Sequence, residues 1–199
     1  MTTQLQGADI GQRLQGAFPN AVTAWGDDEV RVQSDTIVEI CQYLKDTPDL
    51  KMDYLSSITG VDYVESFEVV YHLTSLTHNH SLVLKTTLYG RDDVALPSVI
   101  GVWKGADLQE REVWDLMGIG FTGHPNMKRI LTWEGFPGHP LRKDHLGGYQ
   151  GLPCKRVINT VRRLVVNGGD CGSAIRVYNH QPGPPAPQHA RGVSTSRHP

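Results

Sequence analysis

The chain has 199 residues, of which 39% are hydrophobic and 20% charged, and its formal net charge is −2. A chain of this length can bury one hydrophobic core, and a nearly neutral charge gives no reason to expect nucleic acid or an anionic membrane surface as a partner. Its apolar runs fall short of the roughly 20 residues that cross a bilayer, and residues 1–15 lack the features of a targeting peptide. We therefore expect one domain plus tails, in a protein that stays inside a bacterial cell.

The cysteines and the absent motifs exclude several kinds of site. Cys41, Cys154 and Cys171 are an odd number with no CxxC pair, so we expect free thiols rather than disulfides or iron–sulfur ligands. The sequence also lacks the glycine-rich loops that cradle nucleotide phosphates and the GxSxG motif of a serine nucleophile.

The N-terminal part predicts a helix, a hairpin and a second helix. Apolar residues four apart favour a helix over residues 8–18. Alternating runs at 20–25 and 29–33 flank a Gly-Asp-Asp turn, which is typical of a β-hairpin. Ser34 or Asp35 can cap the second helix, which a Thr-Pro pair ends.

The middle of the chain predicts a sheet. Residues 54–64, 67–76 and 81–90 are rich in Val, Thr, Tyr and Leu and are separated by short polar turns. Sequential strands of this kind pair antiparallel. The predicted fold class is therefore α+β, a two-layer sandwich of a mostly antiparallel sheet with helices, and we assign it to residues 1–118.

A third helix ends this sandwich. Asp107 and Glu110 have the spacing of a capping box, in which each side chain bonds a free backbone N–H at the helix start. Arg111 and Asp115 lie four apart and can pair on the helix surface. Gly118 stands where a left-handed residue commonly ends a helix.

Residues 119–148 predict an extended irregular arm. They show no regular period and are dense in Gly, Pro, aromatic and basic residues, with Gly-His-Pro at both His124 and His139 and a third histidine at His145. Zinc sites commonly use tightly spaced ligand pairs, and these histidines are 15 and 6 residues apart with no cysteine nearby. Bulky aromatic residues beside arginine are typical of interface cores, so we interpret the segment as a docking arm.

The residues of this region carry a resemblance to a known family. EREVWDLMGIGFTGHPNMKRIL (110–131) and GHPLRKDH (138–145) resemble the signature of the C subunit of proton-translocating NADH–quinone oxidoreductase, the respiratory complex I. Weaker agreement in LSSITGVDY and FEVVYHLTSL extends the resemblance over about residues 1–148.

The resemblance implies a structural role within a larger enzyme. Family members carry no cofactor of their own, since FMN and the iron–sulfur clusters lie in partner subunits. They belong to the peripheral arm of the complex, on the cytoplasmic side of the cell membrane, beside the D, B and I subunits. The complex passes electrons from NADH to quinone and couples this transfer to proton translocation.

The charged and histidine residues of the motif are the candidate site residues. We expect them to form ion pairs and hydrogen bonds either within the fold or across a subunit boundary, and we expect Arg142 and Lys143 to face a partner. The set comprises Glu110, Arg111, Glu112, Asp115, His124, Arg129, His139, Arg142, Lys143 and Asp144.

Two alternatives stay open at this point. The same module can serve a related membrane-bound hydrogenase or a plastoquinone-linked complex. A free-standing domain that binds a small ligand with its histidine-rich arm is the other alternative.

The tail, residues 149–199, has a different composition, with polar runs and clustered prolines that predict disorder. One choice of codons for HQPGPPAPQHARGV (180–193), read one base later, gives TNLGPQHPSTHGV, which resembles the opening motif of the complex I D subunit. We hypothesise that the tail is native, or is translated across the start of the gene for that D subunit in a shifted frame, through a gene overlap or a frameshift.

Overall fold

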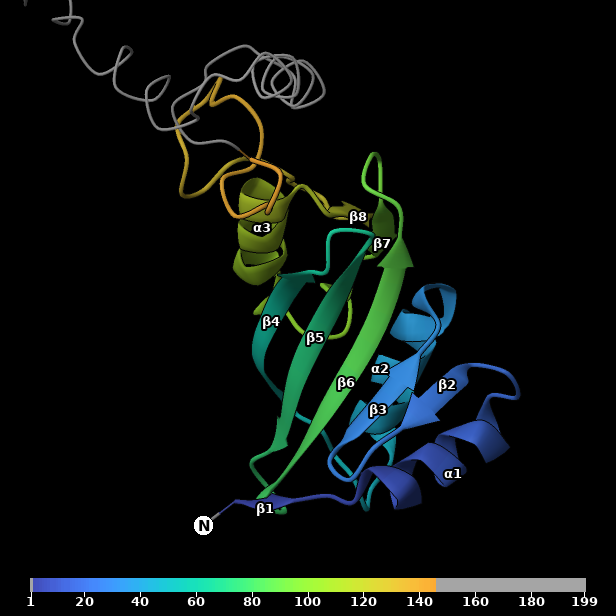
Figure 1. Ribbon diagram of the computed structural model, residues 1–199. Coiled ribbons are helices and arrows are strands. Elements are labelled where there is room, and N and C mark those ends of the chain that lie inside the picture. Colours follow the sequence, from blue (N-terminus) through green and yellow to red (C-terminus); the bar gives the residue numbers. More distant parts are fainter. Residues whose placement is uncertain (1, 146–199) are drawn as a thin grey trace, which may run out of the picture. The chain divides into compact units, whose positions relative to one another are not determined.

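The computed structural model of the chain describes residues 2–145. Its main sheet has six strands in the order β2-β3-β6-β5-β4, with β1 also beside β6 (Figure 1). Three of its pairings are antiparallel, and β6 pairs in parallel with β1 and β3. The mostly antiparallel sheet with its helices confirms the predicted α+β class. The strands are β1 Thr3–Gln4, β2 Val22–Trp25, β3 Glu29–Val32, β4 Tyr54–Asp62, β5 Ser66–Ser75 and β6 His80–Tyr89.

The predicted helix, hairpin and helix are confirmed. Helix α1 is Gly7–Ala17, the β2–β3 hairpin follows, and helix α2 is Ile37–Asp46. The predicted cap of α2 is wrong, because Ser34–Thr36 form a 3-10 turn (η1) and no side chain caps α2. The Thr36 hydroxyl donates to the Gln33 carbonyl instead.

The core lies between α2 and one face of the sheet. Ile40 and Leu44 of α2 are fully buried in the same apolar cluster as Phe67, Tyr71 and Leu73 of β5. These three β5 residues alternate along the strand, which places them on one face. Full burial of an aliphatic or aromatic side chain stabilises the fold by about 1.5–3 kcal/mol, so this layer determines which face of the sheet the helices cover.

Helix α3, Ala106–Met117, packs on β4 at one end of the sheet (Figure 1). The two approach closely because β4 has a glycine there: a Cβ on Gly60 would lie 2.7 Å from the Met117 sulfur. Strands β7 (Ala95–Pro97) and β8 (Gly120–Thr122) form a separate parallel pair on either side of α3 in the sequence. The predicted irregular arm thus contains one short strand at its start.

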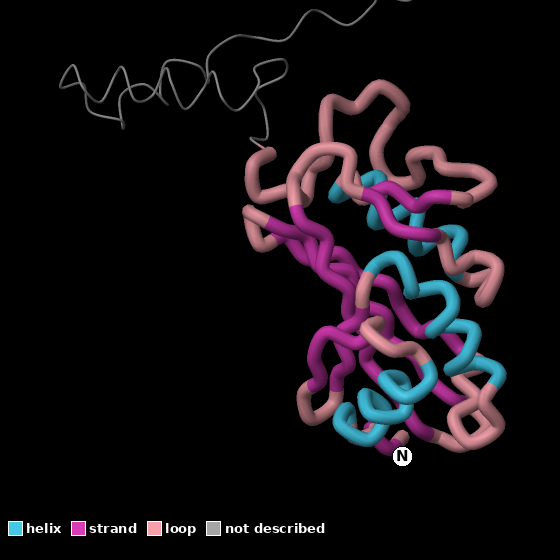
Figure 2. The backbone as a smooth tube through the Cα atoms, turned by 90° about the vertical axis from the view of Figure 1, so that its right-hand side faces the viewer, coloured by secondary structure: helices cyan, strands magenta, loops and turns pink. Residues whose placement is uncertain are grey.

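Residues 123–145, called the arm below, contain neither helix nor strand and appear as loops in Figure 2. None of the helices within residues 2–145 has the length and apolar composition to cross a membrane. The predictions for residues 149–199, including those for Cys154 and Cys171, lie outside the described residues. Cys41 is a free, buried thiol whose pKa is raised by burial.

Candidate functional site: the arm on helix α3

The arm is held to α3 by the buried carboxylate of Asp115. One of its oxygens accepts hydrogen bonds from three consecutive amides, those of Ile130, Leu131 and Thr132, at 2.9–3.0 Å. The other accepts from the Thr132 hydroxyl and, at 2.7 Å, from Arg129. Burial alone would raise the pKa of Asp115, but the bonds from Thr132, Leu131 and Ile130 hold it well below its ordinary value. Asp115 is therefore charged, and removing one partner of such a pair costs about 3–5 kcal/mol.

Arg129 connects the two halves of the arm. Besides Asp115, its guanidinium donates to the Thr132 hydroxyl at 2.9 Å and to the carbonyls of Phe136 and Gly138 at 3.0 and 3.2 Å. Its central carbon also lies 5.7 Å from the ring centre of Trp114 and 5.9 Å from that of Phe136, within reach of a cation–π contact. One arginine thus organises the arm from residue 129 to 138.

The predicted pairing of Arg111 with Asp115 is wrong. Arg111 donates to the backbone carbonyls of Lys128 and Arg129 at 3.1 and 3.5 Å, while Asp115 faces the arm. An exposed pair four residues apart contributes only about 0.2–0.5 kcal/mol, so the five hydrogen bonds to the buried carboxylate outweigh it. Arg111 still anchors the arm, through its backbone.

The second Gly-His-Pro motif closes the C-terminal end of α3. Three groups of the arm bond the last carbonyls of the helix: His139 Nδ1 to that of Asp115 at 2.9 Å, the Leu141 amide to that of Leu116 at 2.9 Å, and Arg142 to those of Met117 and Gly118. These carbonyls would otherwise lack partners. Burial lowers the pKa of His139, so its ring is neutral at pH 7.

Gly118 adopts the predicted left-handed conformation, with φ of 72°. A Cβ there would lie 2.5 Å from both Arg142 and His139. The expectation that Arg142 faces a partner is therefore corrected: its guanidinium caps α3 within the chain, because the turn at Gly118 brings the helix end under it.

A clasp joins the end of the arm to the sheet. Asp62 of β4 accepts from both terminal nitrogens of Arg91 and from the amides of Lys143 and Val64, and Arg91 also pairs with Asp144 at 2.8 Å. Burial would raise the pKa of Asp62, but these bonds outweigh it and lower the pKa to about 2. Sequence reasoning missed Asp62 and Arg91, which stand 29 residues apart in separate elements.

Glu110 does not take part in a capping box. The residue before α3 is Gly105, and no side chain caps the helix. Fully buried Glu110 instead accepts from the Ser98 hydroxyl and, at 2.7 Å, from the Val99 amide. Burial raises its pKa despite these two bonds. The carboxylate thus fixes the segment between β7 and α3, which lies beyond the reach of a local capping pattern.

The first Gly-His-Pro motif lies against the start of α3. The side chain of His124 is buried, its Nδ1 accepts from the Asn126 amide at 3.1 Å, and its Nε2 faces the backbone oxygen of Asp107 at 3.3 Å. Within residues 2–145, no three His, Cys, Asp or Glu side chains lie close enough to share a metal ion.

Other side chains of the arm point outward. Among the ten candidate site residues, Glu112 and Lys143 form no ion pair with any residue in the described part of the chain, and Lys143 is exposed. Large apolar side chains of the arm are exposed as well: Leu131 by 61%, Trp133 by 63% and Leu141 by 59%. The arm therefore combines an internally bonded backbone with an apolar outer surface, as docking surfaces do. Sequence reasoning noted the aromatic density but not these three residues.

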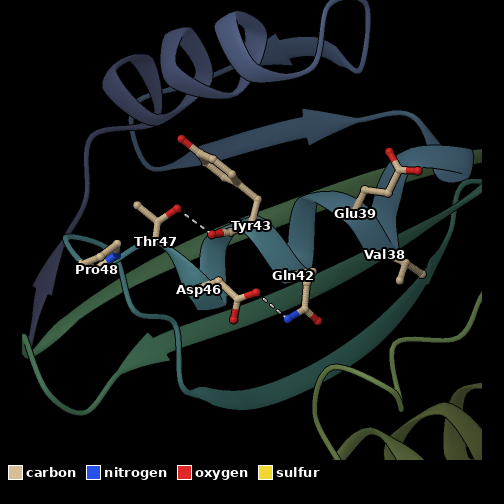
Figure 3. A pocket seen from close by; sticks show the side chains of 7 residues that line it. All are labelled: Val38, Glu39, Gln42, Tyr43, Asp46, Thr47 and Pro48. Atoms are coloured by element: carbon tan, nitrogen blue, oxygen red, sulfur yellow. Dashed lines mark hydrogen bonds between the residues drawn. The ribbon is translucent and has the colours of Figure 1, made fainter.

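A shallow groove on the outer face of α2 is separate from the arm (Figure 3). Its polar groups bond one another: the Gln42 amide donates to Asp46, and the Thr47 hydroxyl to the Tyr43 carbonyl, both at 2.7 Å. Because these groups do not converge on an empty position, the groove gives little support to a small-ligand site. It is lined by Val38, Glu39, Gln42, Tyr43, Asp46, Thr47 and Pro48.

Comparisons with known proteins identify the family. The model of the respiratory-chain NADH dehydrogenase 30 kDa subunit matches residues 30–150. The C subunit of NADH-quinone oxidoreductase from Roseiflexus sp. (strain RS-1) is 42% identical over 147 residues, which are 70% of this chain and 84% of that relative. One of the C subunits of this enzyme from Rhizobium etli (strain CIAT 652), numbered 2, is 45% identical over 150 residues, which are 73% of this chain and 79% of that relative.

A solved structure shares the fold. A chain of the membrane-bound sulfane sulfur reductase, described as an archaeal respiratory membrane complex, superposes with a TM-score of 0.58 and 24% identity, covering 70% of this chain and 85% of that chain. At this identity the likeness speaks for the fold alone. The family match and the two curated relatives confirm the resemblance of the arm motifs, and the chain belongs to the family of respiratory-chain NADH dehydrogenase 30 kDa subunits.

Proposed function

We propose that this chain is the C subunit of a proton-translocating NADH–quinone oxidoreductase and a structural part of its peripheral arm. The observation that carries the proposal is the identity of 42–45% to proteins of that name over most of both chains. The complex transfers electrons from NADH to quinone, and this chain takes part in it as a subunit.

Within that complex the chain acts through geometry and performs no redox step itself. The buried acids Glu110, Asp115 and Asp62 accept hydrogen bonds from amides, hydroxyls and arginines of the same chain. These bonds position backbone and occupy the carboxylates, which supports a structural role. The FMN and the iron–sulfur clusters then belong to partner subunits.

The proposed partners are the D, B and I subunits, on the cytoplasmic side of the membrane. The arm is the surface proposed to meet them, because it exposes Leu131, Trp133 and Leu141 on a backbone fixed by buried bonds. Membrane association is then indirect, through the complex.

A tagged full-length chain, purified from native membranes in mild detergent, tests this function. We expect it to bring down the D, B and I subunits and a flavin-bearing, NADH-oxidising subunit, while the isolated chain shows no flavin or cluster absorbance. A nickel-bearing hydrogenase partner would indicate the related complex instead, and a stable monomer would indicate a free-standing domain.

A further inference from the structure

The outer loop of the arm, residues 130–136, forms a rigid projection that we call the knob. Its exposed Trp133 ring rests edge-on against the ring of Phe136, with ring centres 4.6 Å apart. Phe136 is in turn contacted by Arg129 at 5.9 Å and by the ring of His145, also at 5.9 Å. The tryptophan is therefore exposed and yet held in place.

The base of the knob is fixed by the carboxylate that the sequence placed on a solvated helix face. Asp115 binds the amides of Ile130, Leu131 and Thr132 in succession, and Arg129 binds the Phe136 carbonyl at the far end of the loop. Three consecutive amides on one oxygen leave that backbone little freedom. An exposed loop with no partner has no need of so many bonds, whereas a docking loop gains affinity when it is ordered beforehand.

We propose that Asp115 and Arg129 are positioning residues for subunit docking, which hold the knob so that Leu131 and Trp133 enter an apolar pocket on a neighbouring subunit of the complex. This inference rests on the proposed function. It assigns to the pair a role in binding beyond the stability of the fold.

The size of the apolar surface favours a neighbouring subunit over a second copy of this chain. At their exposed fractions, Ile130, Leu131, Trp133 and Leu141 present on the order of 400 Å². A symmetric dimer through this surface would bury about twice that area, which is below the roughly 1,200 Å² of stable specific interfaces. The knob fits better as one anchor within a wider contact between different subunits.

The first test separates binding from folding by means of surface variants in the full chain. Trp133→Ala is expected to weaken retention of the partner subunits roughly thirtyfold, as for a central aromatic anchor, and to leave the chain's melting temperature unchanged. Tyr54→Ala is the matched control, because Tyr54 is also a half-exposed aromatic residue but starts β4 in the main sheet. Equal retention by Trp133→Ala and wild type would overturn the proposal.

The second test addresses the positioning residue. Asp115→Asn is expected to speed amide hydrogen exchange at residues 130–132 and to weaken partner retention about tenfold or more per folded chain. Leu14→Ala, at a buried position of α1 far along the chain from the arm, should lower the melting temperature while folded molecules keep their partners. If the two variants lose partners only in proportion to their unfolding, Asp115 is merely structural and the proposal fails.

Oxidative footprinting of Trp133 identifies the occupant. The ring should be reactive in the isolated full chain and protected in the complex. Protection already in the isolated chain would mean that residues 146–199 or a second copy cover the knob, and this would contradict the proposal. If the wild-type chain retains no partner at all, the proposed function fails; if it does and Trp133→Ala retains them equally, only this inference fails.

Discussion

Arg142 and Lys143 are adjacent in the sequence, and replacing each by alanine should have opposite effects. Arg142→Ala removes two hydrogen bonds to the last carbonyls of α3 and a guanidinium that lies 5.2 Å from the ring centre of Phe67. Hydrogen bonds with a charged partner contribute about 1.5–3 kcal/mol each when buried, and these are partly exposed, so we expect a loss of about 3 kcal/mol in total.

A loss of this size lowers the melting temperature of a domain of this length by roughly 9 °C. Lys143→Ala removes an exposed side chain, while the amide that binds Asp62 is retained, so its effect on unfolding should stay within about 0.5 kcal/mol. Arg142→Lys, which keeps the charge but loses the planar fork, should fall between the two.

Thermal and urea unfolding of the three variants, followed by circular dichroism, measures these differences. Partner retention from membranes should respond in the reverse order, with Lys143→Ala affected more than its small stability change explains. Equal melting temperatures for Arg142→Ala and Lys143→Ala would refute the assignment of Arg142 as an internal cap.

Three further outcomes are expected. Because the folded pKa of Asp62 lies below its unfolded value, its contribution of about 2 kcal/mol is present above pH 4 and lost as the pH falls toward 2; urea midpoints of wild type and Asp62→Asn should therefore converge in acid, and a constant gap would contradict this. Gly118→Ala places a side chain at φ of 72° against His139, so it should cost more than about 2 kcal/mol by urea unfolding, and a neutral result would contradict the C-cap. Sequencing of the coding DNA should show codons for residues 180–193 that read as the opening motif of the D subunit one base later, and incompatible codons would exclude the overlap.

The sequence predicted the features that depend on local patterns. The helices, the three long strands and the left-handed end of α3 at Gly118 follow from periodicity and from glycine's freedom at positive φ, and these are properties of short segments. The arm was also recognised as a unit, because its composition differs from that of the sandwich.

The partners of the charged residues could not be predicted from spacing. Asp115 has an arginine four residues before it, yet it binds Arg129 and three amides of the arm. Glu110 fits a capping box, yet it bonds the Val99 amide. In both cases a buried carboxylate gains more from several tertiary donors than from one local partner at the surface, and only the fold brings those donors together.

The clasp of Asp62 shows the same limit at longer range. Its partners include the Lys143 amide, 81 residues later, and Arg91 in the loop after β6. No periodic pattern links positions so far apart. Their proximity follows from the pairing of β4 with β5 and from the path of the arm across the end of α3.

Cross-linking of the intact complex, purified from membranes and treated with a lysine-reactive reagent, tests the central claim that the arm joins this chain to its neighbours. Lys128 and the exposed Lys143 of the arm should link to other subunits, whereas Lys51, before β4, serves as the comparison lysine outside the arm. Links from Lys128 and Lys143 into the D, B or I subunits are the predicted result. Links from these two lysines confined to this chain, in a complex that contains all of its subunits, would contradict the account.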